Sequence, residues 1–386
     1  MANRKPKKKG LMRRINDWLH LWLGLVSGII VFIVSITGCF YAFQQEIKDA
    51  VEPWRFVEER NAPLVPPSQL LDTAAKYMPD QHPTGLTYSH STGAAAIGYG
   101  GMVGGKRTFS VIFMNPYTAE FLKKQTPIGG GEFDFFRFII DGHRALWLPY
   151  NIGRPVVGVA TLIFVVLLIT GLVMWWPRRW NKTHKDQSFK IRWRASFKRV
   201  NYDLHNVLGF YSLVFALILG LTGLVWSFTW FDRALYYVTS GGEVKVGHHH
   251  PHSDLANKEI AWNSEVSPLD KAWYLTLEKT DEVNGMYMTP YPADDDDPID
   301  ITVYHDKGSW YDHSEYFYDR YTLEPLEMEG SRYREASFAD KLSMMNYDLH
   351  IGSVGGLSGK VFAFLISLVC ASLPITGFLV WWNKKK

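Results

Sequence analysis

Cysteine is scarce in this chain, which has only Cys39 and Cys370 among its 386 residues. Two thiols are too few for a disulfide framework, for an iron–sulfur cluster held by this chain alone, or for a cysteine-rich zinc module. A flavin or nicotinamide fingerprint is also missing, because the glycine-rich run 98–105 lacks the strand–GxGxxG–helix context and is expected to form a hairpin or loop. Any electron donor is therefore expected to be a separate molecule.

Net charge is small as well, at +3, but the charges are segregated. The stretches 1–14, 177–200 and 384–386 hold 19 of the 41 Lys and Arg residues, whereas 231–349 carries a net charge of −14. This segregation argues against one ordinary soluble globule, and nothing in it indicates nucleic-acid binding. A mean hydropathy of −0.10 excludes a chain that is mostly membrane, so apolar spans beside polar domains are expected.

Long apolar runs occur four times, and each reaches the ~20 residues needed to cross a bilayer. The predicted transmembrane helices are 18–43, 155–176, 204–230 and 361–382. Tryptophan and tyrosine gather at their ends, as in interfacial belts. The positive-inside rule places the basic segments 1–17, 177–203 and 383–386 in the cytoplasm, and it places 44–154 and 231–360 outside.

A second interpretation exists for the N-terminus, because Ile36 to Cys39 resembles a lipoprotein cleavage box. However, the Thr37-Gly38 pair within it recurs in the other three spans, as Thr170-Gly171, Thr222-Gly223 and Thr376-Gly377. We therefore favour a repeated feature of the spans.

The chain indicates two copies of one plan, each with the order span, outer domain, span. His20 and His205 open the odd spans, and each precedes its Thr-Gly pair by 17 residues. His143 and His350 precede the pairs of the even spans by 27 and 26 residues. Both halves run in the same direction, so the predicted fold is a four-helix membrane bundle with an internal parallel two-fold repeat.

The outer segments are predicted to be two small α+β domains. Their matching turns are NPYTAE at 115–120 and DRYTLE at 319–324. The expected helices are 70–79 and 268–280, and the expected strands are 85–99, 106–114, 117–123, 285–291, 299–305 and 315–323.

Topology sorts the four repeated histidines into two pairs at different depths. His20 and His205 lie at the cytoplasmic ends of their spans, whereas His143 and His350 lie near the outer face. A pair of neutral imidazoles from facing helices suits the axial positions of a haem iron. Interfacial hydrogen-bonding or snorkelling histidines are the alternative. Zinc is disfavoured because it prefers four ligands.

Several separated motifs carry a family resemblance: His-x-x-x-Gly at span starts, His143-Arg-Ala-Leu-Trp-Leu, the Thr-Gly pairs and the terminal Trp-Trp. Over 15–383 the chain resembles the PepSY-associated transmembrane family of iron-regulated membrane proteins. Its layout is most similar to the FoxB-type ferric-siderophore reductases of Gram-negative inner membranes. The resemblance implies PepSY-like periplasmic domains, two b-type haems with His20, His205, His143 and His350 as axial ligands, and reduction of a ferric siderophore in the periplasm. His350 departs from the family pattern because the Arg-Ala-Leu-Trp-Leu sequence does not follow it.

Further expectations concern groups around these histidines. Arg144, Arg154 and Arg199 are candidates to neutralise haem propionates. The basic loop 177–200 is a candidate docking site for an acidic cytoplasmic or membrane electron donor. The favoured explanation of its charge is positive-inside topology together with anionic lipid headgroups.

The outer segments hold two candidate metal-binding runs and one electrostatic signal. The candidate metal ligands are His248, His249, His250 and His252, with the acidic run 294–297, and the alternative is solvated loops. The charge of 231–349 predicts a cationic siderophore, such as a trihydroxamate with a free amine. A siderophore or haem transporter without redox chemistry and a PepSY-type regulator remain the alternative functions.

Overall fold

The computed structural model describes residues 10–177, 181–245, 250–259, 265–280, 282–291 and 293–385. The chain forms two compact units. A helical unit contains the residues up to 44, 135–235 and 349–386, and a sheet unit contains 45–134 and 236–348.

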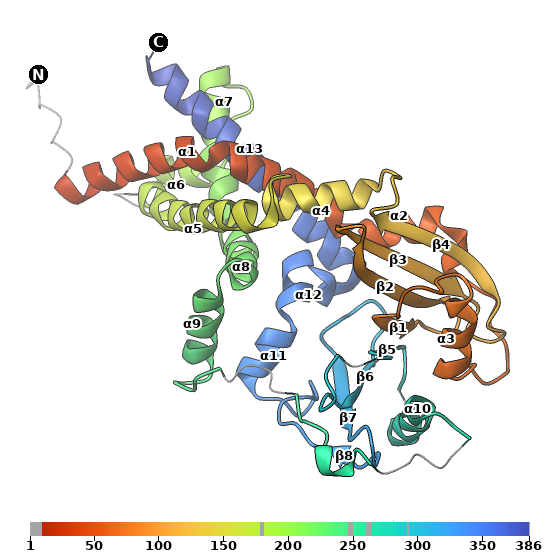
Figure 1. The fold of residues 1–386 in the computed structure, drawn as a ribbon. Helices are drawn as coiled ribbons and strands as arrows, with labels where there is room; N and C mark the ends of the chain where they lie inside the picture. The colour runs from red at the N-terminus through yellow and green to blue at the C-terminus, as the bar shows by residue number, and fades with distance from the viewer. Residues whose placement is uncertain are drawn as a thin grey trace, which may run out of the picture. The chain divides into compact units, whose positions relative to one another are not determined.

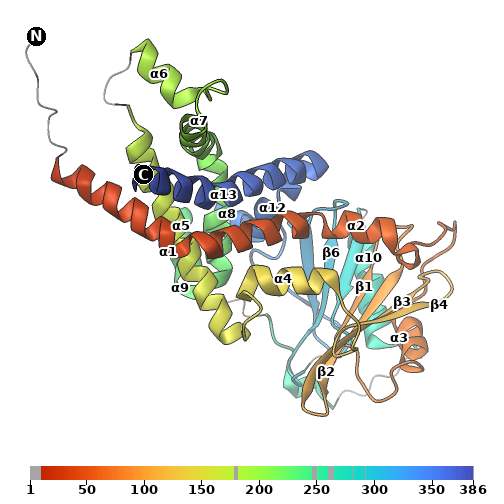
Figure 2. The ribbon, with the colours of Figure 1, turned by 90° about the horizontal axis from the view of Figure 1, so that it is seen from above.

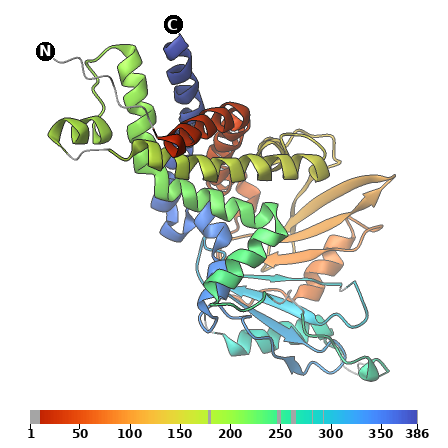
Figure 3. The ribbon, with the colours of Figure 1, turned by 90° about the vertical axis from the view of Figure 1, so that its left-hand side faces the viewer.

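The helical unit is built around four long apolar helices, which confirm the four predicted spans. They are α1 (Leu11–Ala42), α5 (Tyr150–Trp175), α8 (Gly209–Ser227) with the preceding α7 (Phe197–Asp203), and α13 (Gly356–Lys385). Helix α1 packs against α13 and α5, and α5 packs against α8, as Figure 2 and Figure 3 show. The chain is therefore a membrane protein.

Small residues allow these helices to approach closely. A Cβ atom at Gly220 of α8 would lie 2.9 Å from Val165, and one at Gly158 of α5 would lie 2.8 Å from the Phe228 ring. Because lipid offers no hydrophobic force between helices, such close van der Waals packing is a main source of their association.

Shorter helices complete this unit. They are α4 (Phe135–Ala145) before α5 and α6 (Lys182–Phe189) after it, together with the first part of α9 (Thr229–Thr239) after α8 and the last part of α12 (Asn346–Ile351) before α13. Between α7 and α8 the residues Leu204–Leu208 form a single π-helical turn, a feature often found at functional sites.

The sheet unit contains one antiparallel sheet with the order β4-β3-β2-β1-β5-β6-β7-β8 (Figure 1). The strands are β1 (Gly85–Tyr88), β2 (Ala95–Val103), β3 (Lys106–Met114), β4 (Phe121–Ile128), β5 (Gly285–Met288), β6 (Ile299–Tyr304), β7 (His313–Tyr318) and β8 (Pro325–Leu326). Leu70 of α3 (Pro67–Ala75) and Trp273 of α10 (Pro268–Lys279) join the core on one face of this sheet.

This architecture differs from two separate outer domains. Strand β1 pairs with β5, with Thr87 opposite Tyr287, so both segments contribute four strands to one continuous sheet. An unpaired edge strand exposes backbone donors and acceptors, and this central pairing satisfies them on both strands. The segment 44–154 is divided between the units, because its helix α4 belongs to the helical unit.

The observed strands differ from the predicted ones where the chain turns. The expected strand 85–99 is the hairpin β1–β2, and 117–123 begins as a turn before β4. The glycine-rich run forms the β2–β3 hairpin, where Gly104 and Gly105 adopt φ values of 57° and 77°. Positive φ at both central residues is typical of a tight type I′ hairpin turn.

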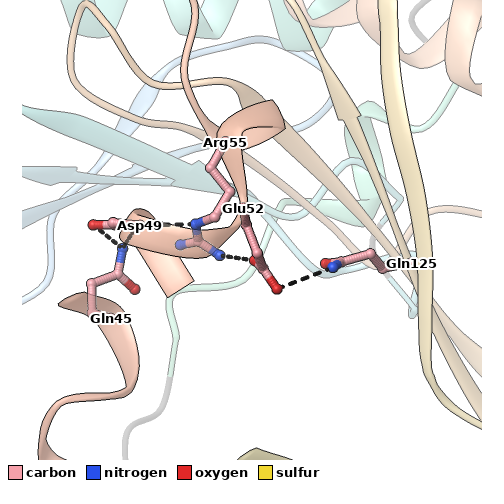
Figure 4. A network of polar contacts seen from close by, with 5 residues as sticks. All are labelled: Gln45, Asp49, Glu52, Arg55 and Gln125. Carbon is pink, nitrogen blue, oxygen red and sulfur yellow. Dashed lines mark hydrogen bonds and ion pairs between the residues drawn. The ribbon is translucent and has the colours of Figure 1, made fainter. Parts of the chain in front are cut away.

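Side-chain contacts fasten the helices of this unit. Asp270 of α10 accepts hydrogen bonds from the backbone N–H of Ser68 (2.8 Å) and from its hydroxyl (2.5 Å). The Glu52 carboxylate accepts hydrogen bonds from Arg55 (3.5 Å) and from Gln125 of β4 (3.2 Å), as Figure 4 shows. The bond from Gln125 connects the segment after α2 (Gln44–Val51) to the sheet.

Candidate functional site

The first histidine pair joins α1 to the π-helical turn. The ring centroids of His20 and His205 lie 6.3 Å apart, with the ring planes at 82°. An asparagine lies four residues before each of these histidines and bonds to the helix that carries the corresponding Thr-Gly pair. Asn16 donates to the carbonyl of Thr170 (3.1 Å), and Asn201 donates to the carbonyl of Thr376 (3.0 Å).

The second pair joins α4 to α12. The centroids of His143 and His350 lie 6.0 Å apart, with the ring planes at 69°. The Trp226 ring packs edge-on against His350 at 5.2 Å. Burial lowers the pKa of His143 to about 4 and that of His350 to about 3. Both imidazoles are therefore neutral at physiological pH, which is the form that binds metals.

Each histidine points its Nδ1 atom at the threonine of one Thr-Gly pair on another helix. The Nδ1–Oγ1 distances are 2.9 Å for His20–Thr170, 2.9 Å for His205–Thr376, 3.3 Å for His143–Thr37 and 2.8 Å for His350–Thr222. His143 is also 2.9 Å from the carbonyl of Val34, three residues before Thr37.

These contacts determine which ring nitrogen carries the proton. Each threonine hydroxyl donates to the carbonyl four residues earlier in its own helix, as Thr37 does to Ile33 (2.7 Å) and Thr222 does to Ile218 (2.7 Å). The hydroxyl oxygen then accepts, so Nδ1 of the histidine is the donor. The lone pair of Nε2 is left available at each ring for a metal.

The separation within each pair suits one metal ion between two imidazoles. With metal–nitrogen bonds of about 2 Å and about 1 Å from each nitrogen to its ring centre, the centroids are expected about 6 Å apart. The observed values are 6.3 and 6.0 Å. In the described part of the chain no group of three or more His, Cys, Asp or Glu residues is placed to hold a metal ion. A planar macrocycle that needs only two axial ligands therefore fits better than zinc.

Glycine follows each of these threonines and leaves room for the imidazole. A Cβ atom would lie 3.1 Å from Cε1 of His143 at Gly38, 3.2 Å from that of His20 at Gly171, and 3.1 Å from that of His205 at Gly377. At Gly223 the distance to Cε1 of His350 is 3.5 Å, which is ordinary contact.

The turn after His143 is strained. Leu146 and Trp147 have φ values of 53° and 58°, which costs residues with a side chain about 1–3 kcal/mol each. The Trp147 indole folds back and donates to the carbonyl of Phe138 (2.8 Å). A Cβ atom at Gly142 would lie 2.3 Å from this ring, so the glycine beside His143 is what permits the turn.

The three candidate arginines have different surroundings. Arg144 is exposed. Arg154 donates to the carbonyl of Trp226 through Nε (2.9 Å) and Nη2 (2.5 Å), and Arg199 forms an ion pair with the buried Asp203 (2.7 Å). Two of the three guanidinium groups thus have protein partners, and a contact with propionates remains a prediction.

The candidate metal-binding runs of the sheet unit are only partly described. His248 and His249 lie outside the described residues. The His250 ring lies 5.5 Å from Phe317, and His252 contacts Asp296 at 3.1 Å. In the acidic run, Asp295 forms an ion pair with Lys258.

Sequence reasoning identified the Thr-Gly pairs as a repeat but missed their contacts with the histidines. It also missed an available signal, since the pentapeptide Asn-Tyr-Asp-Leu-His occurs at both 201–205 and 346–350. Both copies end in a histidine of one of the two pairs, which links His350 to the repeat despite its different downstream sequence.

The two pairs lie at different levels of the bundle. Thr37 contacts His143 and lies 17 residues after His20 on α1, a separation of about 25 Å at 1.5 Å per residue. The fold and site thus define an integral membrane protein whose helical bundle carries two facing histidine pairs. The chain belongs to the family described as PepSY-associated TM region, whose sequence model matches residues 18–384. No curated protein matches the chain.

Proposed function

We propose that this protein is a haem-dependent ferric-siderophore reductase of a bacterial inner membrane. The observation that carries the proposal is the recurrence of one ligand geometry at two levels, with an Nε2 lone pair available at each of the four rings. Haem b, bound between His20 and His205 and between His143 and His350, supplies one-electron transfer between the two faces of the bilayer.

The protein's own residues hold the ligand rings, exclude water and separate the two levels. The bundle also contains a packed apolar cluster that includes Leu168, Ala216, Ile366 and Cys370. With the termini and the basic loop in the cytoplasm, as the positive-inside rule indicates, the pair His20–His205 faces the electron donor. The pair His143–His350 then faces the periplasm, and the repeated arrangement agrees with an internal two-fold repeat.

The substrate chemistry requires only one electron. A ferric siderophore holds Fe(III) through hard oxygen atoms, and addition of one electron gives Fe(II), which these ligands hold less tightly. The donor is a reduced cytoplasmic or membrane partner, which is oxidised by one electron in each event. No general base is required of the protein.

Substrate selection is assigned to the acidic second segment. Its net charge of −14 over 231–349 favours the approach of cationic hydroxamate complexes and disfavours anionic catecholates, most strongly at low salt.

The test uses purified full-length protein reduced by dithionite under argon and then freed of excess reductant. Addition of a cationic ferric trihydroxamate is expected to reoxidise the protein and to release Fe(II), which a ferrous chelator traps. An anionic ferric catecholate at low salt is expected to react more slowly. Absence of reoxidation by any ferric siderophore contradicts the reductase proposal, and equal or faster reaction of the catecholate contradicts the charge selection.

A further inference from the structure

The same arrangement of contacts occurs at each of the four Thr-Gly pairs. In each, a threonine hydroxyl on one helix accepts from Nδ1 of a histidine on another, and a glycine faces the adjacent Cε1 edge of the ring. The hydrogen bond at Nδ1 and the close packing of the glycine against the neighbouring Cε1 both act on one edge of the imidazole, and together they restrict its rotation about the Cβ–Cγ bond. The two rings of each pair are held at steep angles, 82° and 69°.

We propose that Thr37, Thr170, Thr222 and Thr376, each with its glycine, are positioning residues that hold the facing imidazole planes nearly perpendicular. This role rests on the proposed haem ligation. The angle between the ring planes would then affect the energies of the iron d orbitals. Perpendicular axial rings act equally on the two iron d orbitals that overlap with their π systems, so these orbitals remain close in energy. Such low-spin ferric iron gives a strongly anisotropic EPR signal, whereas coplanar rings separate the orbitals and reduce the anisotropy.

The hydrogen bond has a second consequence for the reduction potential. Donation from Nδ1 makes the imidazole a more electron-rich ligand, as second-shell acceptors generally do. An electron-rich ligand stabilises the ferric state, so loss of the threonine acceptor is expected to raise the potential of the haem concerned.

The experiment compares variants of Thr170, which contacts His20. Thr170→Val keeps the shape of the side chain and removes the hydroxyl, and Thr170→Ser restores a hydroxyl. The matched control is Thr161→Val on the same helix, whose hydroxyl donates to the carbonyl of Val157 (2.9 Å). The readouts are haem content, EPR spectra of the oxidised protein and a potentiometric titration of both haems.

We expect two strongly anisotropic signals in the unmodified protein and in Thr161→Val. In Thr170→Val one of the two signals should become less anisotropic and the potential of that haem should rise, while the other haem is unchanged. Thr170→Ser should restore the signal. Thr376→Val, on the opposite side of the same pair, should alter the same haem and serves as the second variant if Thr170→Val does not fold.

Unchanged signal and potential in both Thr170→Val and Thr376→Val would overturn the proposal, as would coplanar-type signals in the unmodified protein. A protein without haem would overturn both this inference and the proposed function. Two haems with the expected EPR changes in Thr170→Val and Thr376→Val, but no reaction with ferric siderophores, would refute the proposed substrate and support the positioning role.

Discussion

Replacing the glycines of the Thr-Gly pairs by alanine should weaken haem binding in a graded way. Gly38, Gly171 and Gly377 leave 3.1–3.2 Å between a built Cβ atom and the neighbouring imidazole, whereas Gly223 leaves 3.5 Å. Overpacking of this kind costs about 1–3 kcal/mol. The same change stabilises the interior of a helix by about 0.5–1 kcal/mol, so the fold itself should be little affected.

The cost therefore falls mainly on the placement of the ligand ring. At 1.36 kcal/mol per factor of ten, haem affinity should fall about 5- to 150-fold in Gly38→Ala and Gly171→Ala. Gly223→Ala should stay within about 2-fold of the unmodified protein, because its added methyl group makes ordinary contact.

Haem loss can be followed by transfer to an excess of a haem-scavenging apoprotein, with the two haems distinguished by their potentials. Gly171→Ala should release the haem at the His20–His205 pair, and Gly38→Ala should release the other. Gly24→Ala is the matched control, since its Cβ atom would lie 3.8 Å from Leu167. Equal loss in Gly223→Ala and Gly38→Ala, or loss of the wrong haem in Gly171→Ala, would refute the steric reasoning.

Three further predictions concern other residues. His20→Ala should remove one haem and His143→Ala the other, as measured by haem content and potentiometry; loss of the same haem in both variants contradicts the pairing. Gly142→Ala should destabilise the turn that Trp147 covers, because its Cβ atom would lie 2.3 Å from the ring; proteolysis of the α4–α5 connection should accelerate, and an unchanged rate argues against a constrained turn. Burial raises the pKa of Asp300 in the folded protein. The folded state therefore holds this proton more tightly than the unfolded state, and the free energy of unfolding decreases as pH rises from the ordinary carboxyl pKa to the folded pKa. Asp300→Asn should therefore raise the thermal stability at neutral pH, with the gain vanishing below the ordinary carboxyl pKa of about 3.9; a gain independent of pH contradicts this assignment.

The spans and the pairing of histidines could be predicted because both are repeated along the chain at regular intervals. Apolar runs of sufficient length predict membrane helices, and equal His-to-Thr-Gly intervals indicated equivalent positions in the two halves. The structure brings His20 to His205 and His143 to His350, and ligation of haem by these rings remains a prediction.

Contacts between distant segments could not be predicted in the same way. Strand β1 pairs with β5 across about 200 residues, and no local pattern encodes that partner. The contact of Thr170 with His20 likewise depends on how α1 and α5 face each other. The hairpin within 85–99 was missed although its turn contains the polar run Ser-His-Ser-Thr-Gly at 89–93, which is typical of turns.

The haem stoichiometry of the purified full-length protein tests the central claim most directly. Two haems per chain, with the split visible bands of six-coordinate low-spin iron after reduction, are the result expected from two bis-histidine sites. A colourless preparation obtained from haem-replete cells would contradict the assignment of the histidine pairs.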